Sequence, residues 1–227
     1  MEPCNPEKYF DVSNIHIGID LDHTIINYQQ IFAERAFSLG YTNHNVKMTK
    51  EEVKTKVKKL KDGEKKWGLL QIEVYTDGIS EAIIMEGFSE FVNVCKERGI
   101  SLSVISHKSR NNPQDAFKRD LQESALDWMN KQHFFEKSGF GFSLDQVFFA
   151  ETIEDKVARI KILKCSHFVD DLLKVLLHSC FPESTRKILY TSLPEIDNAA
   201  VDGSDSSDTA AVDVGKDDVG KDDAAVD

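Results

Sequence analysis

Long apolar runs and grouped metal-binding residues are both missing from this sequence of 227 residues. No run approaches the roughly 20 apolar residues that a membrane-spanning helix needs, and residues 1–14 have neither a basic start nor an apolar stretch of signal-peptide length. The four cysteines are scattered without CxxC spacing, and the seven histidines form no HExxH pattern. These absences argue against a membrane partner, a zinc site and a disulfide framework, and we expect a cytoplasmic protein.

Glycine-rich phosphate loops are missing as well. Neither GxGxxG nor GxxxxGK[ST] follows an expected strand, which argues against an α/β protein that binds nucleotides through such a loop. No GxSxG turn is present, so the sequence does not predict a Ser-His-Asp hydrolase of that type.

Negative charge is concentrated at the C-terminal end of the chain. The formal net charge is −11, and residues 198–227 contribute nine Asp and two Lys to it. This segment repeats Ala-Ala-Val-Asp three times and has no aromatic residue or apolar stripe that could offset the entropy of ordering. Nor does it have the ligand spacing of an EF-hand calcium loop. We expect residues 1–197 to form the folded domain and residues 198–227 to form a disordered acidic tail.

An apolar run over residues 15–19 is followed by two carboxylates, Asp20 and Asp22. Side chains two positions apart leave a strand on the same side, so both point from its carboxyl end, where open α/β sheets bind ligands. Such a pair suits a nucleophile and a proton shuttle. The alternative is an acidic loop in which Asp22 or Thr24 caps a helix.

Polar residues follow three later apolar runs. Residues 102–105 lead to Ser106, residues 147–149 precede Lys156, and residues 167–169 lead to the pair Asp170-Asp171. A further strand is expected near 187–190. Helical patterns lie between the runs: one before the third strand is marked by Leu121, Ala125, Trp128 and Met129, and one before the fifth by Leu172, Leu173, Leu176 and Leu177. This alternation predicts an α/β fold with a doubly wound parallel sheet.

These residues resemble the four motifs of the haloacid dehalogenase-like superfamily: DLDHT, VISHKS, Lys156 and FVDDLL. The resemblance covers about residues 15–190, and the first and last motifs are the specific ones. It implies a Rossmann-like core with strand order 5-4-1-2-3 and an insertion after the first strand that covers the active site.

The connection between the first two strands is too long for a single crossover helix. We therefore expect residues 28–80 to contain that inserted cap. Thr49 and Glu52 form a capping box, and apolar residues then recur at helical spacing. Residues 47–66 contain nine lysines and four acids. This could be an anion-facing surface, but a solvated helix face is favoured because no aromatic residues are interleaved for nucleic-acid stacking. We expect Trp67 and Tyr75 to close a small core in the cap.

The resemblance also assigns roles to the candidate site residues. Asp20 would be the nucleophile, and Asp22 the general acid and base. Mg²⁺ would bind Asp20, the main-chain carbonyl of Asp22, and Asp170, with Asp171 as a ligand through water or an orienter of Lys156. Lys156 and Ser106 would hold the phosphoryl group, with Thr24 in the turn. His107 and Lys108 either touch the substrate or form an exposed basic turn.

The sequence therefore predicts a Mg²⁺-dependent phosphatase that hydrolyses a small phosphorylated metabolite through an aspartyl phosphate. A phosphomutase or a phosphotransferase would use the same residues, and an idle binding protein is a further alternative. Dehalogenases of the superfamily lack the second Asp, and P-type ATPases have Thr in its place. The cap lysines leave phosphonate cleavage open. Nucleic acid is not favoured as a partner, and the oligomeric state is not predicted.

Removing residues 198–227 should leave the melting temperature and the turnover of the protein nearly unchanged, because the segment cannot contribute a packed core. Thermal unfolding and steady-state kinetics of the truncated chain test this. A truncated protein that melts several degrees lower would show that the segment docks on the domain.

Overall fold

The computed structural model describes residues 12, 14–43 and 48–191. The expected tail at residues 198–227 lies outside this part of the chain.

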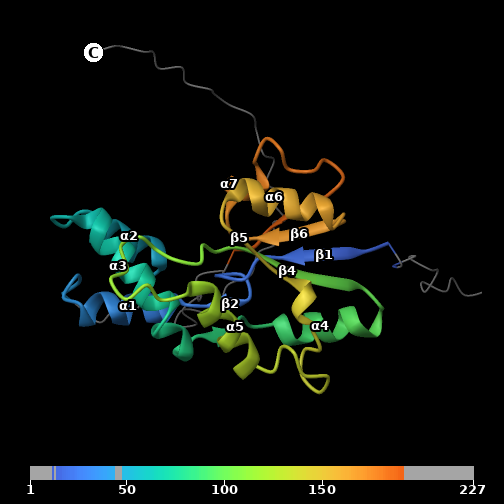
Figure 1. Ribbon diagram of the computed structural model, residues 1–227, viewed down its shortest axis with the longest axis horizontal. Coiled ribbons are helices and arrows are strands. Elements are labelled where there is room, and N and C mark those ends of the chain that lie inside the picture. The colour runs from blue at the N-terminus through green and yellow to red at the C-terminus, as the bar shows by residue number, and fades with distance from the viewer. Residues whose placement is uncertain (1–11, 13, 44–47, 192–227) are drawn as a thin grey trace, which may run out of the picture. The chain divides into compact units, whose positions relative to one another are not determined.

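A five-stranded parallel sheet forms the centre of the fold (Figure 1). Its strands are β1 (His16–Ile19), β4 (Ser101–His107), β5 (Val147–Ala150), β6 (His167–Asp170) and β7 (Arg186–Leu189). They lie in the order β5-β4-β1-β6-β7. Because β2 and β3 lie outside this sheet, β4, β5, β6 and β7 are its second to fifth strands along the chain. Counted in this way and read from the β7 edge, the order is the predicted 5-4-1-2-3, which is confirmed. The carboxyl ends of β4, β1 and β6 are therefore adjacent, as the predicted site requires.

Helices cover both faces of the sheet. In Figure 1, α4 (Phe88–Glu97) and α5 (Leu121–Lys131) lie on one side, and α6 (Ile153–Ile162) and α7 (Leu173–Leu176) lie on the other. The predicted apolar stripe of α5 is buried in full, at Leu121, Ala125, Trp128 and Met129. The stripe expected at α7 is wrong in part: α7 is a single turn, with Leu176 buried but Leu173 and Leu177 exposed.

A helical segment lies between two short strands, β2 (Ile26–Asn27) and β3 (Ile83–Ile84), which pair antiparallel. It contains α1 (Gln29–Ser38), α2 (Lys50–Lys58), α3 (Gly63–Tyr75) and the 3₁₀ helix η1 (Gly78–Glu81), and α1, α2 and α3 pack against one another. The predicted capping box is present at the start of α2: the Thr49 side chain accepts from Glu52 N, and Thr49 N donates to the Glu52 carboxylate at 2.7 Å.

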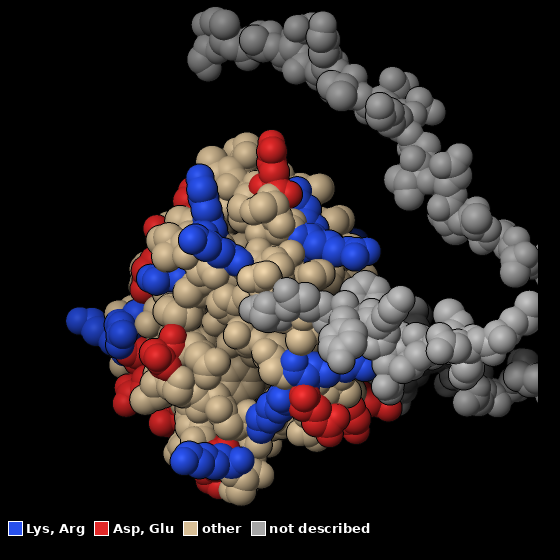
Figure 2. All heavy atoms as spheres, turned by 90° about the vertical axis from the view of Figure 1, so that its right-hand side faces the viewer, with Lys and Arg blue, Asp and Glu red and all other residues tan. Residues whose placement is uncertain are grey.

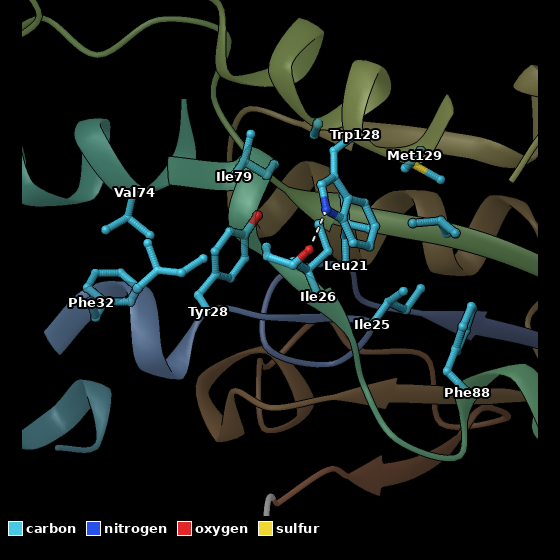
Figure 3. Close-up of a cluster of buried hydrophobic side chains, with 14 of the residues drawn as sticks. Leu21, Ile25, Ile26, Tyr28, Phe32, Val74, Ile79, Phe88, Trp128 and Met129 are labelled. Carbon is cyan, nitrogen blue, oxygen red and sulfur yellow. Dashed lines mark hydrogen bonds between the residues drawn. The ribbon is translucent and has the colours of Figure 1, made fainter. Parts of the chain in front are cut away.

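One hydrophobic cluster joins this helical segment to the sheet. Figure 3 shows Tyr28, Phe32 and Val74 of the segment packed beside Leu21, Ile25 and Ile26, with Trp128 and Met129 of α5 on the other side. Trp128 Nε1 donates to the Ala82 carbonyl at 3.0 Å. Trp67 stacks on Phe32 with ring centroids 5.4 Å apart, as predicted for a residue of the segment's own core.

The side of the molecule at which β1 begins is charged mainly at its margin. Figure 2 shows basic and acidic side chains interspersed around this face, with uncharged residues over much of its centre. Among the described residues, no helix is both long and apolar enough to cross a membrane.

Gly18 allows β1 and β6 to lie close together beneath the site. A Cβ added at Gly18 would lie 2.7 Å from Phe168 Cδ2 and 3.0 Å from Cys165 Sγ. Gly18→Ala should therefore lower the free energy of unfolding by about 1–3 kcal/mol through overpacking.

Denaturant unfolding of Gly18→Ala checks this, and Phe168→Leu provides the control. In the Phe168→Leu background the penalty of Gly18→Ala should shrink, because the clashing ring is gone. Equal penalties in the two backgrounds would contradict the contact.

Candidate active site

The ammonium of Lys156 joins two carboxylates at the carboxyl ends of β1 and β6. Its Nζ lies 2.5 Å from Asp20 Oδ1 and 2.6 Å from Asp170 Oδ2, and all three side chains are buried. Asp20 N donates to the Val169 carbonyl at 2.9 Å, which fixes the end of β1 against β6. Thr152 caps α6 through Asp155 N and so sets the position from which Lys156 reaches the sheet. The structure thus brings together three residues that lie far apart in the sequence.

Asp171 joins Asp20 and Asp170 in a compact acidic cluster, with one oxygen of each carboxylate within 4.8 Å of the others. Burial raises the pKa of Asp20 to about 8, because the Lys156 ammonium only partly offsets burial and the charges of Asp170, Asp171 and Asp22. Burial likewise raises the pKa of Asp171 to about 6. Three carboxylates facing one buried lysine leave an excess of negative charge.

The residues fit a divalent cation that prefers oxygen ligands. Closely spaced carboxylates are ligands that Mg²⁺ prefers, and a bound cation would offset the burial and the mutual repulsion that raise these pKa values. Ser106 is consistent with a ligand beside the cluster: its Oγ is buried at the end of β4 and has no hydrogen-bond partner among the described residues. A buried hydroxyl without a partner is costly, so it is available to bind a ligand oxygen.

Asp22 occupies a different environment from Asp20. Lys108 Nζ lies 2.8 Å from Asp22 Oδ2, and the Tyr28 hydroxyl donates to Asp22 Oδ1 at 2.7 Å. Burial acts to raise the pKa of Asp22, but Lys108 and Tyr28 outweigh it and the net pKa is lowered. Asp22 is therefore held as a carboxylate. Lys108 is 4% exposed, so the alternative of an exposed basic turn is wrong for this residue.

A wall beside Asp22 is formed by three side chains, those of Tyr28, Tyr75 and His23. The Tyr75 ring centroid lies 4.5 Å from Lys108 Nζ, and its hydroxyl is 3.2 Å from His23 Nε2. Tyr75 thus lies at the site, and it also packs against the core as predicted, with its ring centroid 5.7 Å from that of Phe32. Burial lowers the pKa of His23 to about 3, helped by Lys50 and Lys108, so the imidazole is neutral at physiological pH.

Tyr28 and Tyr75 were missed as site residues because neither belongs to a motif. Tyr28 and Tyr75 lie 6 and 53 residues after Asp22, and only the packing of α1 and α3 brings both to it. The position of His23 inside DLDHT was the only signal, and such a position does not distinguish a wall residue from a turn residue.

Among the described residues, no hydrogen bond joins the predicted site residues His107 and Thr24 to the acidic cluster. His107 is half-buried, and its Nε2 is 3.2 Å from the Glu151 carbonyl in the loop after β5. Thr24 is buried, and its hydroxyl has no partner among the described residues. It lines a mostly apolar pocket of about 340 Å³ with Ile19, Phe88 and Val169.

No family model matches the chain, and no curated protein matches it. Solved structures do. A haloacid dehalogenase-like family hydrolase from Streptococcus pneumoniae is 13% identical, with a TM-score of 0.52 over 79% of this chain and 86% of that chain. The fold is haloacid dehalogenase-like.

Further proteins of this fold align over similar lengths. A superfamily hydrolase from Ehrlichia chaffeensis is 14% identical over 78% of this chain and 87% of its own, with a TM-score of 0.46. A superfamily hydrolase from Geobacter sulfurreducens is 14% identical over 79% of this chain and 89% of its own, also with a TM-score of 0.46. At these identities the likeness to haloacid dehalogenase-like proteins is one of fold, and the chemistry has to be argued from the site.

The raised pKa values of Asp20 and Asp171 predict two opposite pH trends. In the metal-free protein the unfolded carboxyls lose their protons near pH 4, while the folded ones keep them until about pH 8 and 6. Stability should therefore fall as the pH rises from 5 to 8. Mg²⁺ must displace these protons, so its affinity should rise more than about tenfold over the same range.

Thermal unfolding with and without Mg²⁺ between pH 5 and pH 8.5 measures both trends. Asp20→Asn is the control: it should flatten the upper part of each curve. A Mg²⁺ affinity that does not change with pH would contradict the assignment of these carboxylates to the cation.

Proposed function

We propose that this protein is a Mg²⁺-dependent phosphoric monoester hydrolase that acts on a small phosphorylated metabolite through an aspartyl phosphate on Asp20. One observation carries the proposal: Asp20 ends β1 in contact with a buried lysine, in an acidic cluster with Asp170 and Asp171. The haloacid dehalogenase-like fold supports it, because open α/β sheets bind their ligands at the carboxyl ends of the strands, where Asp20 lies.

Mg²⁺ would be held by Asp20, Asp170, Asp171 and the main-chain carbonyl of Asp22, and would supply the positive charge that a carboxylate needs to approach a phosphate ester. Lys156 contacts Asp20 and Asp170 at 2.5 and 2.6 Å, and no ion pair within 4.0 Å joins it to Asp171 among the described residues. This favours a place for Asp171 at the cation over a role as the orienter of Lys156.

The chain's own residues divide the reaction between them. The Asp20 carboxylate attacks phosphorus, and the bond from phosphorus to the ester oxygen breaks. The Ser106 hydroxyl and the Lys156 ammonium hold non-bridging oxygens of the phosphoryl group, and Lys156 also balances the charge on Asp20. Water then attacks the aspartyl phosphate, which releases phosphate and restores Asp20.

Asp22 transfers a proton in each of the two steps. As a carboxylate it accepts the proton of the attacking water, which agrees with its lowered pKa. To protonate the leaving oxygen in the first step it must itself gain a proton, and the two groups that contact it each carry one: the Tyr28 hydroxyl at 2.7 Å and the Lys108 ammonium at 2.8 Å. Burial raises the pKa of the Tyr28 hydroxyl well above its usual value, which favours Lys108 as the source. We infer that the Asp22–Lys108 pair acts as a unit in this step.

The helical segment α1–α3 acts as a cap in this proposal. Its residues Tyr28 and Tyr75 reach Asp22 and Lys108, so the segment supplies one wall of the space beside the nucleophile. The same residues would serve a phosphomutase or a phosphotransferase. Release of inorganic phosphate into water distinguishes a hydrolase from both.

Substitutions of three of the carboxylates test the mechanism. Asp20→Asn should abolish turnover and the covalent intermediate, a loss of several orders of magnitude, equivalent to about 4 kcal/mol or more in the barrier. Asp22→Asn should slow breakdown of the aspartyl phosphate by a similar amount, and Asp170→Asn should weaken Mg²⁺ binding and recover in part at high Mg²⁺. Phosphate release and rapid-quench detection of the phosphorylated protein are the measurements.

Two controls keep these outcomes specific. Asp127→Asn changes an exposed acid of α5 and should be silent. Asp22→Asn leaves the buried Lys108 without its counter-charge, so the double variant Asp22→Asn with Lys108→Met separates lost chemistry from lost stability. The proposal fails if the wild-type protein with Mg²⁺ hydrolyses none of a panel of sugar phosphates, nucleotides, amino-alcohol phosphates and phospholipid head groups. It also fails if Asp20→Asn retains turnover.

A further inference from the structure

The residues that carry the proposed reaction are covered. Asp20 is 5% exposed, and Lys156 is 1% exposed. Beside them, the Tyr75 ring at the end of α3 lies 4.5 Å from Lys108 Nζ. In the proposed function a phosphate ester has to reach Asp20, so the segment α1–α3, which supplies one wall of the site, has to move aside to admit it. The contacts that hold this segment against the core are therefore part of the working site.

The connection between β4 and α5, residues 108–120, lies against α3. In Figure 1 it extends beside α3 before it returns to α5. A Cβ added at Gly68 of α3 would clash with the side-chain amide of Gln114, so helix and connection are in close contact there. The connection begins with Lys108, whose carbonyl accepts from Gln122 Nε2 at 2.8 Å. One stretch of chain thus touches both the candidate site and the helical segment.

Arg119, near the end of this connection, contacts carboxylates on both sides. Its Nη1 lies 2.5 Å from Asp77 Oδ2, just after α3, and 3.6 Å from Glu73 Oε2 within α3. Its Nε lies 3.1 Å from Asp115 Oδ2 in the connection itself. We refer to these four residues as the Arg119 cluster. Glu73 and Asp77 lie two residues before and two residues after Tyr75, so the cluster fixes the part of the segment that brings Tyr75 to the site.

Each half of the Arg119 cluster keeps a partner when the halves separate. Asp115 is buried and accepts from both the main-chain N and the Nε of Arg119, at 2.7 and 3.1 Å. Glu73 has Arg35 of α1 at 3.8 Å, and the Asp77 side chain is 64% exposed to water. Separation therefore leaves no buried charge without a counter-charge, which would be the costly outcome. The contact between connection and helix can be broken and formed again.

We propose that Arg119 is a positioning residue that holds the segment α1–α3 closed over the site through Glu73 and Asp77. Closure places Tyr75 against the lysine and aspartate that transfer the proton to the leaving group. The role in proton transfer rests on the proposed function, whereas the closure does not. Because the contacts to α3 are partly exposed ion pairs, closure weakens as the ionic strength rises.

Distances between two spin labels measure closure without turnover. In the full-length protein with Cys4 and Cys180 replaced by Ser, one label is placed at Thr55→Cys in α2 and the other at Asp127→Cys in α5, both exposed positions. Adding Arg119→Gln should lower the ratio of short to long distances in double electron–electron resonance by about three- to thirtyfold at low ionic strength, because two ion pairs are lost.

Two further variants make the distance measurement specific. Arg110→Gln is the matched control: Arg110 Nη1 lies 2.6 Å from Asp120 Oδ2, and both residues belong to the connection, so the distances should not change. Asp77→Asn leaves Arg119 with the buried Asp115 and should give part of the shift. Combining Asp77→Asn with Arg119→Gln should shift the distances no further than Arg119→Gln alone.

Kinetics with two esters separate positioning from a purely structural role. Arg119→Gln should lower kcat/KM for glycerol 3-phosphate by about three- to tenfold. The loss for 4-nitrophenyl phosphate should stay below about twofold, because its leaving oxygen needs no proton. The ratio of the wild-type value to the variant value should approach one as the ionic strength rises to about 0.5 M.

Unchanged distances in Arg119→Gln would overturn the role of Arg119 in closure, and if that variant does not fold, unchanged distances in Asp77→Asn would do so. Equal losses of kcat/KM for the two esters would overturn its role in proton transfer. Shifted distances in a protein that hydrolyses no phosphate ester would instead overturn the proposed hydrolase while retaining closure by Arg119.

Discussion

The buried contact of Lys156 with Asp20 and Asp170 is the interaction on which the rest of the site depends. It joins β1, β6 and α6 at one point, with distances of 2.5 and 2.6 Å. Moving such ions out of water costs several kcal/mol for each of them, and removing one partner leaves a buried charge without compensation. The arrangement is therefore a poor way to gain stability and a good way to hold a carboxylate in one position.

A second buried lysine, Lys108, shifts the pKa of the neighbouring carboxylate, Asp22, in the opposite direction. Asp20 and Asp22 lie two residues apart, yet the pKa of one is raised to about 8 and the pKa of the other is lowered. The difference lies in their neighbours: Asp20 shares Lys156 with other carboxylates, whereas Asp22 has Lys108 and the Tyr28 hydroxyl to itself. Two carboxylates with opposed pKa shifts suit two roles in one reaction.

Much of the core could be predicted because its signals are local. Short apolar runs that end in Asp20, Ser106 and Asp170 identify strands and their carboxyl ends, and the parallel order of the sheet then brings these residues together. The capping box at Thr49 is also a local pattern, confined to four residues.

The wall of the site could not be predicted in the same way. Lys108 is flanked by polar residues and reads as part of an exposed turn, and only the distant Asp22 and Tyr75 explain why it is buried. Tyr75 was predicted only as a core residue, because sequence periodicity indicates which side of α3 is apolar but not that Lys108 lies against it. The truncated α7 shows the same limit, since four leucines suggested a longer apolar stripe than the fold uses.

The short hairpin of β2 and β3 has a consequence for how such a protein can change over time. The whole helical segment enters and leaves the core through two adjacent residue pairs, Ile26 with Ile84 and Asn27 with Ile83. Its two ends are therefore neighbours whatever lies between them, so helices can be lengthened, exchanged or lost there without altering the register of the parallel sheet. The wall beside Asp22 can thus diverge rapidly, while the carboxyl ends of β1, β4 and β6 stay constrained by one another.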